Sequence, residues 1–209
     1  MKNQRITFRL EKEDDYRYVE NLIRESFYNV YRPGCFEHYV MHVIRDRDDF
    51  VKELDILMEL DGKVIGQNVF AKTYIKEDNG NLKEVLTMGP ISIDPKYKRK
   101  GYGKILLDYC LEKAKELGYG AVFIEGLYDF YSKCGFEYVV NKYNIKYEDY
   151  PLEIYEKIFL VNELIPGYLS NIKGTYEGYQ GYIVKDDEVD KFDATFPPKK
   201  KRKLPTQLF

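Results

Sequence analysis

The stretch Leu86-Thr-Met-Gly-Pro-Ile-Ser-Ile-Asp-Pro-Lys-Tyr-Lys-Arg-Lys-Gly-Tyr-Gly-Lys-Ile-Leu-Leu-Asp-Tyr109 holds an apolar strand, a basic turn with two glycines and the start of a helix. A helix start presents backbone N–H groups that have no partner inside the helix, and the helix dipole adds partial positive charge, so a phosphate binds well there. Gly101 and Gly103 carry no side chain that would hold a diphosphate away from the backbone. Positive charge comes from Lys98, Arg99, Lys100 and Lys104. We call residues 98–104 the cradle and predict that it binds a pyrophosphate.

Two common phosphate motifs do not fit the spacing of the cradle. A nucleotide P-loop needs Ser or Thr after Gly-Lys, but Gly103-Lys104 is followed by Ile105. A dinucleotide fingerprint needs a third glycine three residues after the second, and position 106 is Leu. What remains is a basic residue, two further residues, and then Gly-x-Gly.

This pattern resembles motif A of the GNAT superfamily of N-acetyltransferases, Gln/Arg-x-x-Gly-x-Gly/Ala, which holds the pyrophosphate of acetyl-CoA. Lys98 stands where the family most often has Gln or Arg. The alternative is a basic helix start with an ordinary glycine turn. By resemblance, the residues expected to bind acetyl-CoA are Ile91, Ser92, Ile93, Lys98, Arg99, Lys100, Gly101, Tyr102, Gly103 and Lys104.

A second motif follows about 28 residues after the first. Tyr131-Ser-Lys-Cys-Gly-Phe136 is similar to the Tyr-x-Lys-x-Gly-Phe signature of GNAT proteins. There a short helix ends at the glycine, as expected for a helix C′ residue with positive φ. The resemblance implies that Tyr131 is the general acid that protonates the CoA thiolate as it leaves. The resemblance to the family covers roughly residues 5–165.

The resemblance also implies how the donor enters the sheet. Gly89-Pro90 weakens a strand and predicts a bulge or splay, because proline cannot donate to a ladder. In GNAT proteins the fourth strand parts from the fifth here, and backbone groups matching Ile91 and Ile93 hydrogen-bond the pantetheine arm. A bulge at a simple strand bend is the alternative. Many GNAT proteins have an Asn after the fifth strand, where this chain has Gly126-Leu127-Tyr128.

The acceptor amine must lose a proton before it attacks a thioester, so a general base is required. Glu125 is the first candidate, with Glu59 and Glu84 as weaker ones; each has a solvated or structural role as the alternative. We expect no metal. His38 and His42 have i, i+4 spacing, but no Glu follows His38 and no third ligand lies beside them.

The acceptor pocket of GNAT proteins is lined by the region between the first two helices, here Pro33 through Arg45. Its polar candidates for substrate contact are Glu37, His38 and His42. The exposed face of a surface helix is an equal alternative. This segment, together with Phe159-Leu-Val-Asn-Glu-Leu-Ile-Pro-Gly-Tyr-Leu169, resembles a branch of uncharacterised bacterial GNAT proteins.

The expected fold class is α/β (α+β): a mixed, mostly antiparallel GNAT-like sheet flanked by helices, with splayed fourth and fifth strands. Strands are expected at 6–10, 55–60, 63–75, 83–93 and 122–126, and helices from residue 14 or 15 up to Pro33-Gly34, at 36–45 and at 101–117. Asp61-Gly62 predicts a hairpin turn. The helix at 101–117 is expected to bury Ile105, Leu106, Tyr109, Cys110, Ala114 and Leu117. We expect residues 1–165 to form the GNAT domain and 166–209 an extension on or trailing from it.

Composition indicates a soluble globular chain of 209 residues that is 44% hydrophobic and 33% charged. No stretch approaches 18 consecutive apolar residues, and Met1–Arg5 leads into a strand instead of an apolar signal segment. Three cysteines, an odd number, predict free thiols in a bacterial cytoplasm. Cys110 is expected to pack in the core, and Cys134 is not expected to be a nucleophile.

The run Pro197-Pro-Lys-Lys-Lys-Arg-Lys-Leu204 looks like a nuclear localisation signal or a nucleic-acid contact. Usage typical of A+T-rich bacterial genomes argues against the first role, and nucleic acid is not an expected partner. Whether Lys199–Lys203 has any role is left open. Without these five basic residues the chain has 28 basic against 35 acidic groups, a net of −7, which favours a cationic acceptor.

The sequence therefore predicts an acetyl-CoA-dependent N-acetyltransferase that acts in a ternary complex on a small-molecule or polypeptide amine. A non-catalytic CoA-binding GNAT-like module is the alternative. No membrane partner is expected, and a homodimer is left open.

Overall fold

The computed structural model of the chain describes residues 5–148, 150–205 and 207. Residues 1–4, expected to lead into the first strand, lie outside the described residues. The chain divides into two compact units. Unit 1 holds Met1–Val69, Pro90–Leu106 and Gln180–Phe209, and unit 2 holds Phe70–Gly89 and Leu107–Tyr179.

The sheet of unit 1 begins with three antiparallel strands. β1 (Ile6–Leu10) pairs with β2 (Ile56–Leu60), and β2 pairs with the first half of β3 (Lys63–Glu77). Asp61 (φ 52°) and Gly62 (φ 81°) join β2 to β3 in the left-handed conformation that a two-residue hairpin turn requires. The hairpin predicted at Asp61-Gly62 is confirmed.

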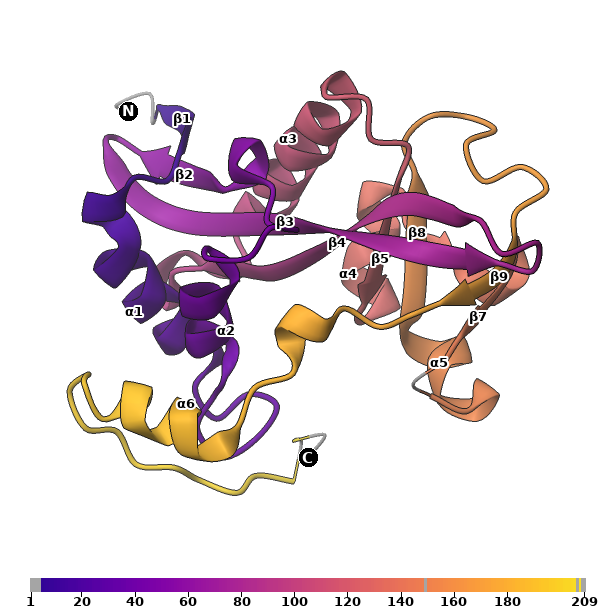
Figure 1. Cartoon of the computed structure of the whole chain (residues 1–209). Helices are drawn as coiled ribbons and strands as arrows, with labels where there is room; N and C mark the ends of the chain where they lie inside the picture. Colours follow the sequence, from indigo (N-terminus) through magenta and orange to yellow (C-terminus); the bar gives the residue numbers. More distant parts are fainter. Residues whose placement is uncertain (1–4, 149, 206, 208–209) are drawn as a thin grey trace. The chain divides into compact units, whose positions relative to one another are not determined.

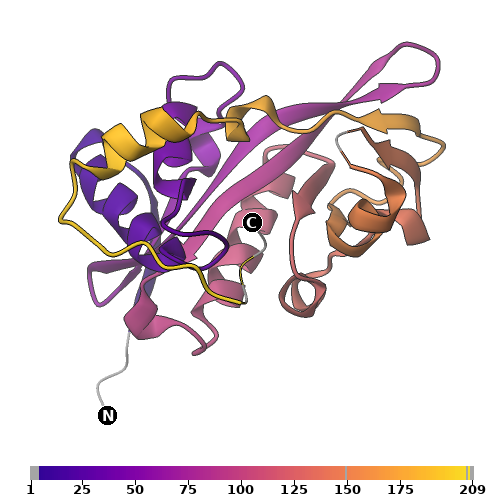
Figure 2. The ribbon, with the colours of Figure 1, turned by 90° about the horizontal axis from the view of Figure 1, so that it is seen from below.

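Three helices of unit 1 pack together. α1 (Tyr16–Phe27) lies against α2 (Glu37–Ile44), and α6 (Asp186–Asp193) lies beside α2 although it is far along the chain (Figures 1 and 2). α1 buries Val19, Leu22 and Ile23. It was expected to run up to Pro33-Gly34, but it ends at Phe27. It ends early because Asn29 takes a left-handed φ of 61° and its N–H donates to the carbonyl of Gly34.

Unit 2 continues the sheet. β3 and β4 (Leu82–Ile93) pass from one unit into the other, and the hydrogen-bonded order is β1-β2-β3-β4-β5-β8-β6, with β9 pairing β3 and β7. The strands of unit 2 not yet given are β5 (Ala121–Glu125), β6 (Glu137–Tyr138), β7 (Asn144–Tyr147), β8 (Phe159–Glu163) and β9 (Lys173–Tyr176). Most pairs are antiparallel; β4–β5 and β7–β9 are parallel. This is the mixed, mostly antiparallel sheet that the sequence predicts.

Strands β4 and β5 pair over a short distance only. The parallel register joins Leu86 to Val122 and Thr87 to Phe123, and it stops before Gly89. Gly89 has a φ of 141°, which breaks the regular strand geometry next to Pro90. The predicted parting of the fourth and fifth strands is confirmed.

The helices that follow β4 and β5 differ in detail from prediction. α3 (Tyr102–Glu116) buries Leu106, Leu107, Cys110, Leu111 and Ala114, whereas Ile105 is 40% exposed and Leu117 is 50% exposed. The prediction was wrong for Ile105 and Leu117, because the buried stripe is turned toward the Leu107 and Leu111 side of the helix. The other helices are α4 (Tyr128–Tyr131) and α5 (Leu152–Ile158), and the 3-10 turns are η1 (Glu13–Asp15), η2 (Lys52–Leu54), η3 (Pro95–Tyr97), η4 (Ser132–Cys134), η5 (Val139–Asn141) and η6 (Gln180–Tyr182).

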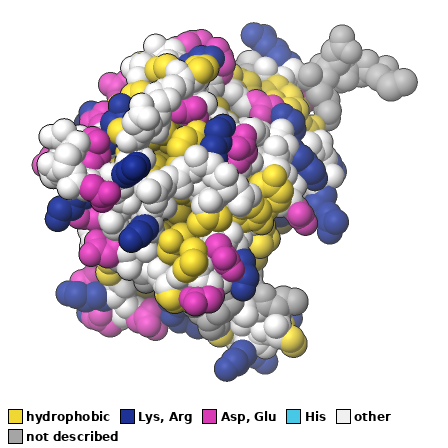
Figure 3. All heavy atoms as spheres, turned by 90° about the vertical axis from the view of Figure 1, so that its right-hand side faces the viewer, with side chains coloured by type: hydrophobic (Ala, Val, Ile, Leu, Met, Phe, Trp, Pro, Cys, Tyr) yellow, Lys and Arg dark blue, Asp and Glu magenta, His cyan; other side chains and the backbone are white. Residues whose placement is uncertain are grey.

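Unit 2 has an aromatic core in which Phe123, Tyr147, Phe159 and Tyr176 meet. On the face seen in Figure 3, hydrophobic side chains reach the surface among charges of both signs. Each helix in the described residues is too short or too polar to span a bilayer.

Candidate functional site

The connection from β4 to α3 is tied down before the cradle begins. The N–H of Asp94 donates to the carbonyl of Ile65 at 2.8 Å, which fixes the end of β4 beside β3. The Asp94 side chain then accepts from the N–H of Lys96 at 2.9 Å and caps η3. The chain therefore enters the cradle from a defined position.

The backbone of the cradle turns back on itself through two left-handed residues. Arg99 has a φ of 61° and Gly101 a φ of 89°. Such turns let successive N–H groups face one side and form an anion-binding concavity. A Cβ at Gly101 would have no heavy atom within 4 Å, so its backbone is open to a ligand. These features, ahead of the first turn of α3, fit a diphosphate.

The basic side chains of the cradle do not all serve the same purpose. The Lys98 ammonium donates to the carbonyl of Ser26 at 2.6 Å, and partial burial lowers the pKa of Lys98. Lys100 lies with Nζ 5.5 Å from the ring centroid of Tyr97, and Arg99 is exposed. Sequence reasoning missed Ser26, because nothing local to it indicates a partner 72 residues away.

Ile91, Ser92 and Ile93 form the end of β4. Their neighbour is Gly66, where an added Cβ would come within 2.6 Å of Ile93 Cδ1 and 3.2 Å of the Ser92 carbonyl oxygen. The Ser92 hydroxyl is buried and has no hydrogen-bond partner among the described residues. β3 and β4 thus approach closely beside the cradle.

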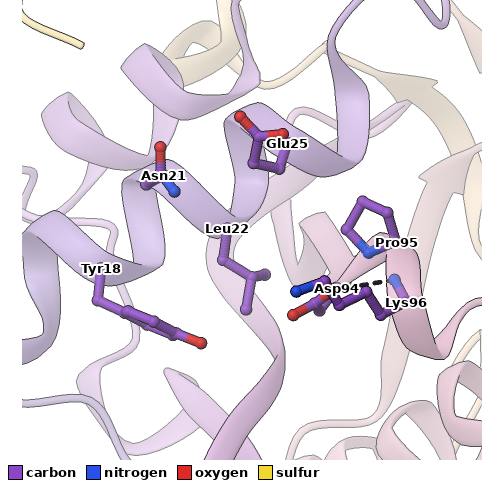
Figure 4. A pocket seen from close by; sticks show the side chains of 7 residues that line it. All are labelled: Tyr18, Asn21, Leu22, Glu25, Asp94, Pro95 and Lys96. Carbon is purple, nitrogen blue, oxygen red and sulfur yellow. Dashed lines mark hydrogen bonds between the residues drawn. The ribbon is translucent and has the colours of Figure 1, made fainter. Parts of the chain in front are cut away.

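A pocket of about 250 Å³ adjoins this turn within unit 1 (Figure 4). Figure 4 shows α1 side chains on one wall and the residues after β4 on the other, with the Asp94–Lys96 hydrogen bond at the second wall. The lining residues are Tyr18, Asn21, Leu22, Glu25, Asp94, Pro95 and Lys96. Tyr18 is 43% exposed, and its hydroxyl donates to the carbonyl of Val64 at 2.9 Å.

In unit 2, Tyr131 ends α4 and packs by its ring. The centroid of Phe136 lies 5.5 Å away in an edge-on arrangement. Gly135 has a φ of 82°, as predicted for the glycine that ends this helix. A Cβ at Gly126 would lie 2.3 Å from Tyr131 Cε2. The absence of a side chain at Gly126 therefore leaves room for the ring of Tyr131.

Glu125, the first candidate base, accepts a short hydrogen bond from the hydroxyl of Tyr147. Burial, followed by the charge of Glu125, raises the pKa of Tyr147, so this phenol stays a donor. Of the weaker candidates, Glu59 accepts from Arg9 Nε at 2.6 Å, so its carboxylate is ion-paired with Arg9 across the β1–β2 ladder. Glu84 lies 3.5 Å from the hydroxyl of Tyr74.

The three acceptor candidates occupy different environments on α2. Burial raises the pKa of Glu37 to about 7, which is near the value a general base needs at neutral pH. His42 is half exposed, with Nδ1 2.9 Å from Glu20 Oε1. His38 is fully buried between the rings of Phe192 and Phe196 and therefore presents no polar atom to a substrate.

His38 lies in a chain of groups that has the order of a catalytic triad. Cys35 Sγ is 3.4 Å from His38 Nδ1, and His38 Nε2 is 3.2 Å from Asp193 Oδ1. Burial raises the pKa of Cys35 above its ordinary range and lowers the pKa of His38 to about 4. The thiol of Cys35 and the imidazole of His38 are both neutral at pH 7 and out of contact with solvent, so no thiolate forms. The three side chains instead hold α6 in place.

The basic run at the C-terminus folds back onto unit 1. Lys199 pairs with Glu25 at 2.8 Å, and the Lys199 carbonyl accepts from the hydroxyl of Tyr28 at 2.9 Å. Asn29 donates to the carbonyl of Lys200 at 3.0 Å and accepts from the N–H of Arg202 at 2.9 Å. We call residues 197–204 the basic segment.

The predicted residues fall into both units. The cradle, Glu37, His38 and His42 belong to unit 1, whereas Tyr131 and Glu125 belong to unit 2. The three cysteines are free and buried. Within the part of the chain that the structure describes, no three His, Cys, Asp or Glu side chains are grouped to hold a metal ion.

Comparison with known proteins gives a consistent result. The model of the acetyltransferase (GNAT) family matches residues 16–136. An uncharacterised N-acetyltransferase, YhbS of Escherichia coli K12, is 29% identical over 119 residues, which are 57% of this chain and 66% of YhbS. The match thus spans slightly less than two thirds of that relative.

Two crystal structures share the fold. YhbS of Escherichia coli in complex with CoA superposes with a TM-score of 0.74 at 24% identity, covering 87% of this chain and 94% of YhbS. A GNAT family acetyltransferase of Brucella melitensis in complex with acetyl-CoA gives a TM-score of 0.67 at 18% identity, covering 86% and 99%.

Proposed function

Because the chain belongs to the acetyltransferase (GNAT) family, we propose that it transfers an acetyl group from acetyl-CoA to a primary amine. The observation that carries the proposal is the cradle, where left-handed Arg99 and Gly101 present open backbone at the start of α3. Both structural relatives described above were crystallised with CoA or acetyl-CoA.

The proposed chemistry is direct transfer in a ternary complex. Bound acetyl-CoA supplies a thioester carbonyl; the amine nitrogen attacks it, a C–N bond forms and the C–S bond breaks. Cradle amides and the basic side chains of the cradle other than Lys98 hold the diphosphate, and backbone groups of Ile91 and Ile93 hold the pantetheine arm. Tyr131 gives its proton to the leaving sulfur, and the second proton that the nitrogen loses as the amide forms restores the tyrosine.

The proton of the acceptor ammonium goes to a carboxylate. Glu125 remains our proposed base, since its hydrogen bond from Tyr147 fixes the position of its carboxylate. Glu37 is a second candidate because burial raises its pKa to about 7. With His42 it is also a proposed acceptor contact, whereas the burial of His38 favours a packing role for that residue. The free, buried cysteines support a reducing, cytoplasmic location.

The experiment is a panel of small amines and peptide amines with acetyl-CoA, in which free CoA thiol is measured together with acetyl-CoA binding by calorimetry. Tyr131→Phe is expected to keep the affinity and to lower turnover about 100-fold or more. Tyr128→Phe, on the same helix, is the matched control. Binding without thiol release across the panel would favour a non-catalytic CoA-binding module, and absence of binding would overturn both functions.

A further inference from the structure

The side chain of Lys98 faces the helix before the cradle. Its ammonium donates to the carbonyl of Ser26 at 2.6 Å, one residue before the end of α1. The carbonyls of a last helical turn have no partner inside the helix, and the helix dipole makes this end negative. An ammonium is therefore well placed there.

The backbone around the end of α1 leaves this carbonyl to Lys98. The N–H of Tyr28 donates to Arg24, that of Asn29 to Gly34, and that of Val30 to Phe27. None of these amides takes the carbonyl of Ser26. The hydroxyl of Ser26 meanwhile donates to the carbonyl of Ile93 at 2.9 Å, so one buried residue contacts both β4 and the cradle.

We propose that Lys98 is a positioning residue, which fastens the cradle to the C-terminal end of α1 and does not itself bind the pyrophosphate. The next residue, Arg99, has a left-handed φ of 61°, which a non-glycine residue keeps only when the surrounding structure holds it. The Lys98–Ser26 hydrogen bond is one of the contacts that hold it. The inference rests on the proposed function in that it concerns the same diphosphate site.

The test compares Lys98→Met, Lys98→Arg and Lys100→Met. Hydrogen exchange of the ligand-free protein reports the order of residues 98–103, and calorimetry reports the affinity for CoA and for S-acetylpantetheine, which has no diphosphate. Each affinity is measured at low and at high salt. Circular dichroism checks that every variant is folded.

Lys98→Met is expected to speed exchange at residues 98–103 and to weaken CoA binding about fivefold to tenfold at both salt concentrations. Binding of S-acetylpantetheine should not change, and Lys98→Arg should restore most of the CoA affinity because it keeps a donor. Lys100→Met also removes one positive charge, but it leaves the hydrogen bond between Lys98 and Ser26 intact. Its loss of affinity should shrink at high salt, with exchange unaltered.

Unchanged exchange in Lys98→Met would overturn the proposal. So would a loss of CoA affinity that disappears at high salt as in Lys100→Met, because Lys98 would then be a phosphate ligand. Failure of the unsubstituted protein to bind CoA would overturn the proposed function instead. The exchange experiment on the ligand-free protein would still decide the role of Lys98.

Discussion

At the scale of single residues, Gly126 and Tyr131 constrain each other. A Cβ at Gly126 would lie 2.3 Å from Tyr131 Cε2, far inside van der Waals contact. Gly126 therefore has a steric role next to Tyr131. The sequence does not reveal this role, because it depends on where the ring of Tyr131 lies.

Gly126→Ala is expected to displace the ring of Tyr131 and to lower turnover at least tenfold, while acetyl-CoA affinity changes little. The physical reason is the steric clash, since misplacing a reacting group by about 1 Å is costly. A double-mutant cycle with Tyr131→Phe checks the cause. If the losses of the two single variants multiply in the double variant, Gly126 does not act through Tyr131.

The pH profile of kcat/KM is expected to identify the base. Because the base must be deprotonated, activity should rise with pH through its pKa; for Glu37 this is about 7. If Glu37 is the base, Glu37→Gln removes the rise near pH 7 and lowers activity. If Glu125 is the base, Glu125→Gln removes the rise that the unsubstituted protein shows, at whatever pH it lies, and Glu37→Gln leaves that rise in place.

At the scale of elements, α6 is held to α1 and α2 by a buried charged cluster. Arg24 is 1% exposed and donates to Asp193 through Nε at 2.6 Å. Burial raises the pKa of Asp193, but the hydrogen bond and charge of Arg24 outweigh it and lower that pKa overall. His38 lies against the same carboxylate. A helix 169 residues away therefore completes the packing of α1.

The buried His38 is expected to contribute less to the stability of the protein in mild acid than at neutral pH. Its pKa is about 4 in the folded chain, against about 6.5 unfolded, so the unfolded chain binds more protons between these values. The contribution of His38 to the free energy of unfolding should therefore fall by up to about 3 kcal/mol as pH drops from 6.5 to 4. Glu37, whose pKa burial raises to about 7, contributes with the opposite sign over this range, so the contribution of His38 is measured as the difference between the unsubstituted protein and His38→Gln in urea unfolding. This difference should shrink by that amount toward pH 4, and the half-exposed His42→Gln should show no such pH-dependent difference.

The basic segment predicts a stabilising role at the end of α1. A chain ending at Phe196 loses the bonds to Tyr28 and Asn29 and the pairs with Glu25 and Asp190. The free energy of unfolding should fall by about 1–3 kcal/mol, mostly from the backbone hydrogen bonds, because exposed ion pairs are screened. Lys199→Ala with Lys201→Ala, which removes only the pairs, should cost under about 1 kcal/mol. If urea unfolding gives the truncated chain and the double variant equal losses of unfolding free energy, the backbone hydrogen bonds contribute nothing and the prediction is wrong.

At the scale of the whole molecule, charge is unevenly distributed along the chain. The formal net charge is −2, and it would be −7 without the five basic residues at 199–203. In the fold, Lys199 and Lys201 from this run are paired with Glu25 and Asp190. Part of the positive charge is thus neutralised by local acidic groups.

A net acidic protein is expected to attract cationic acceptors at long range. Between roughly 20 and 200 mM salt, kcat/KM for an alkyl ammonium acceptor should fall about twofold to fivefold, because salt screens this attraction. An aromatic amine that is neutral at pH 7 is the control and should change little. The same fall for both amines would assign the effect to acetyl-CoA binding.

The sequence by itself determined what depends on local physics. Gly62, Gly101 and Gly135 take the positive φ that their turns require, so the hairpin, the turn of the cradle and the end of η4 followed from residue type and spacing. Strand alternation and helix periodicity predicted β1 to β5 and the helices α1, α2 and α3. The periodicity of the sequence did not determine which face of α3 is buried. For that reason Ile105 and Leu117 were wrongly predicted to be buried.

Only the tertiary structure decided the partners that lie far along the chain. The Lys98 ammonium meets a carbonyl 72 residues away, Glu125 meets Tyr147, and Arg24 meets Asp193 across 169 residues. Long side chains reach in several directions, and their choice depends on which unpaired acceptor the fold brings within about 3 Å. For the same reason His38, polar in the sequence, became core once α6 covered it.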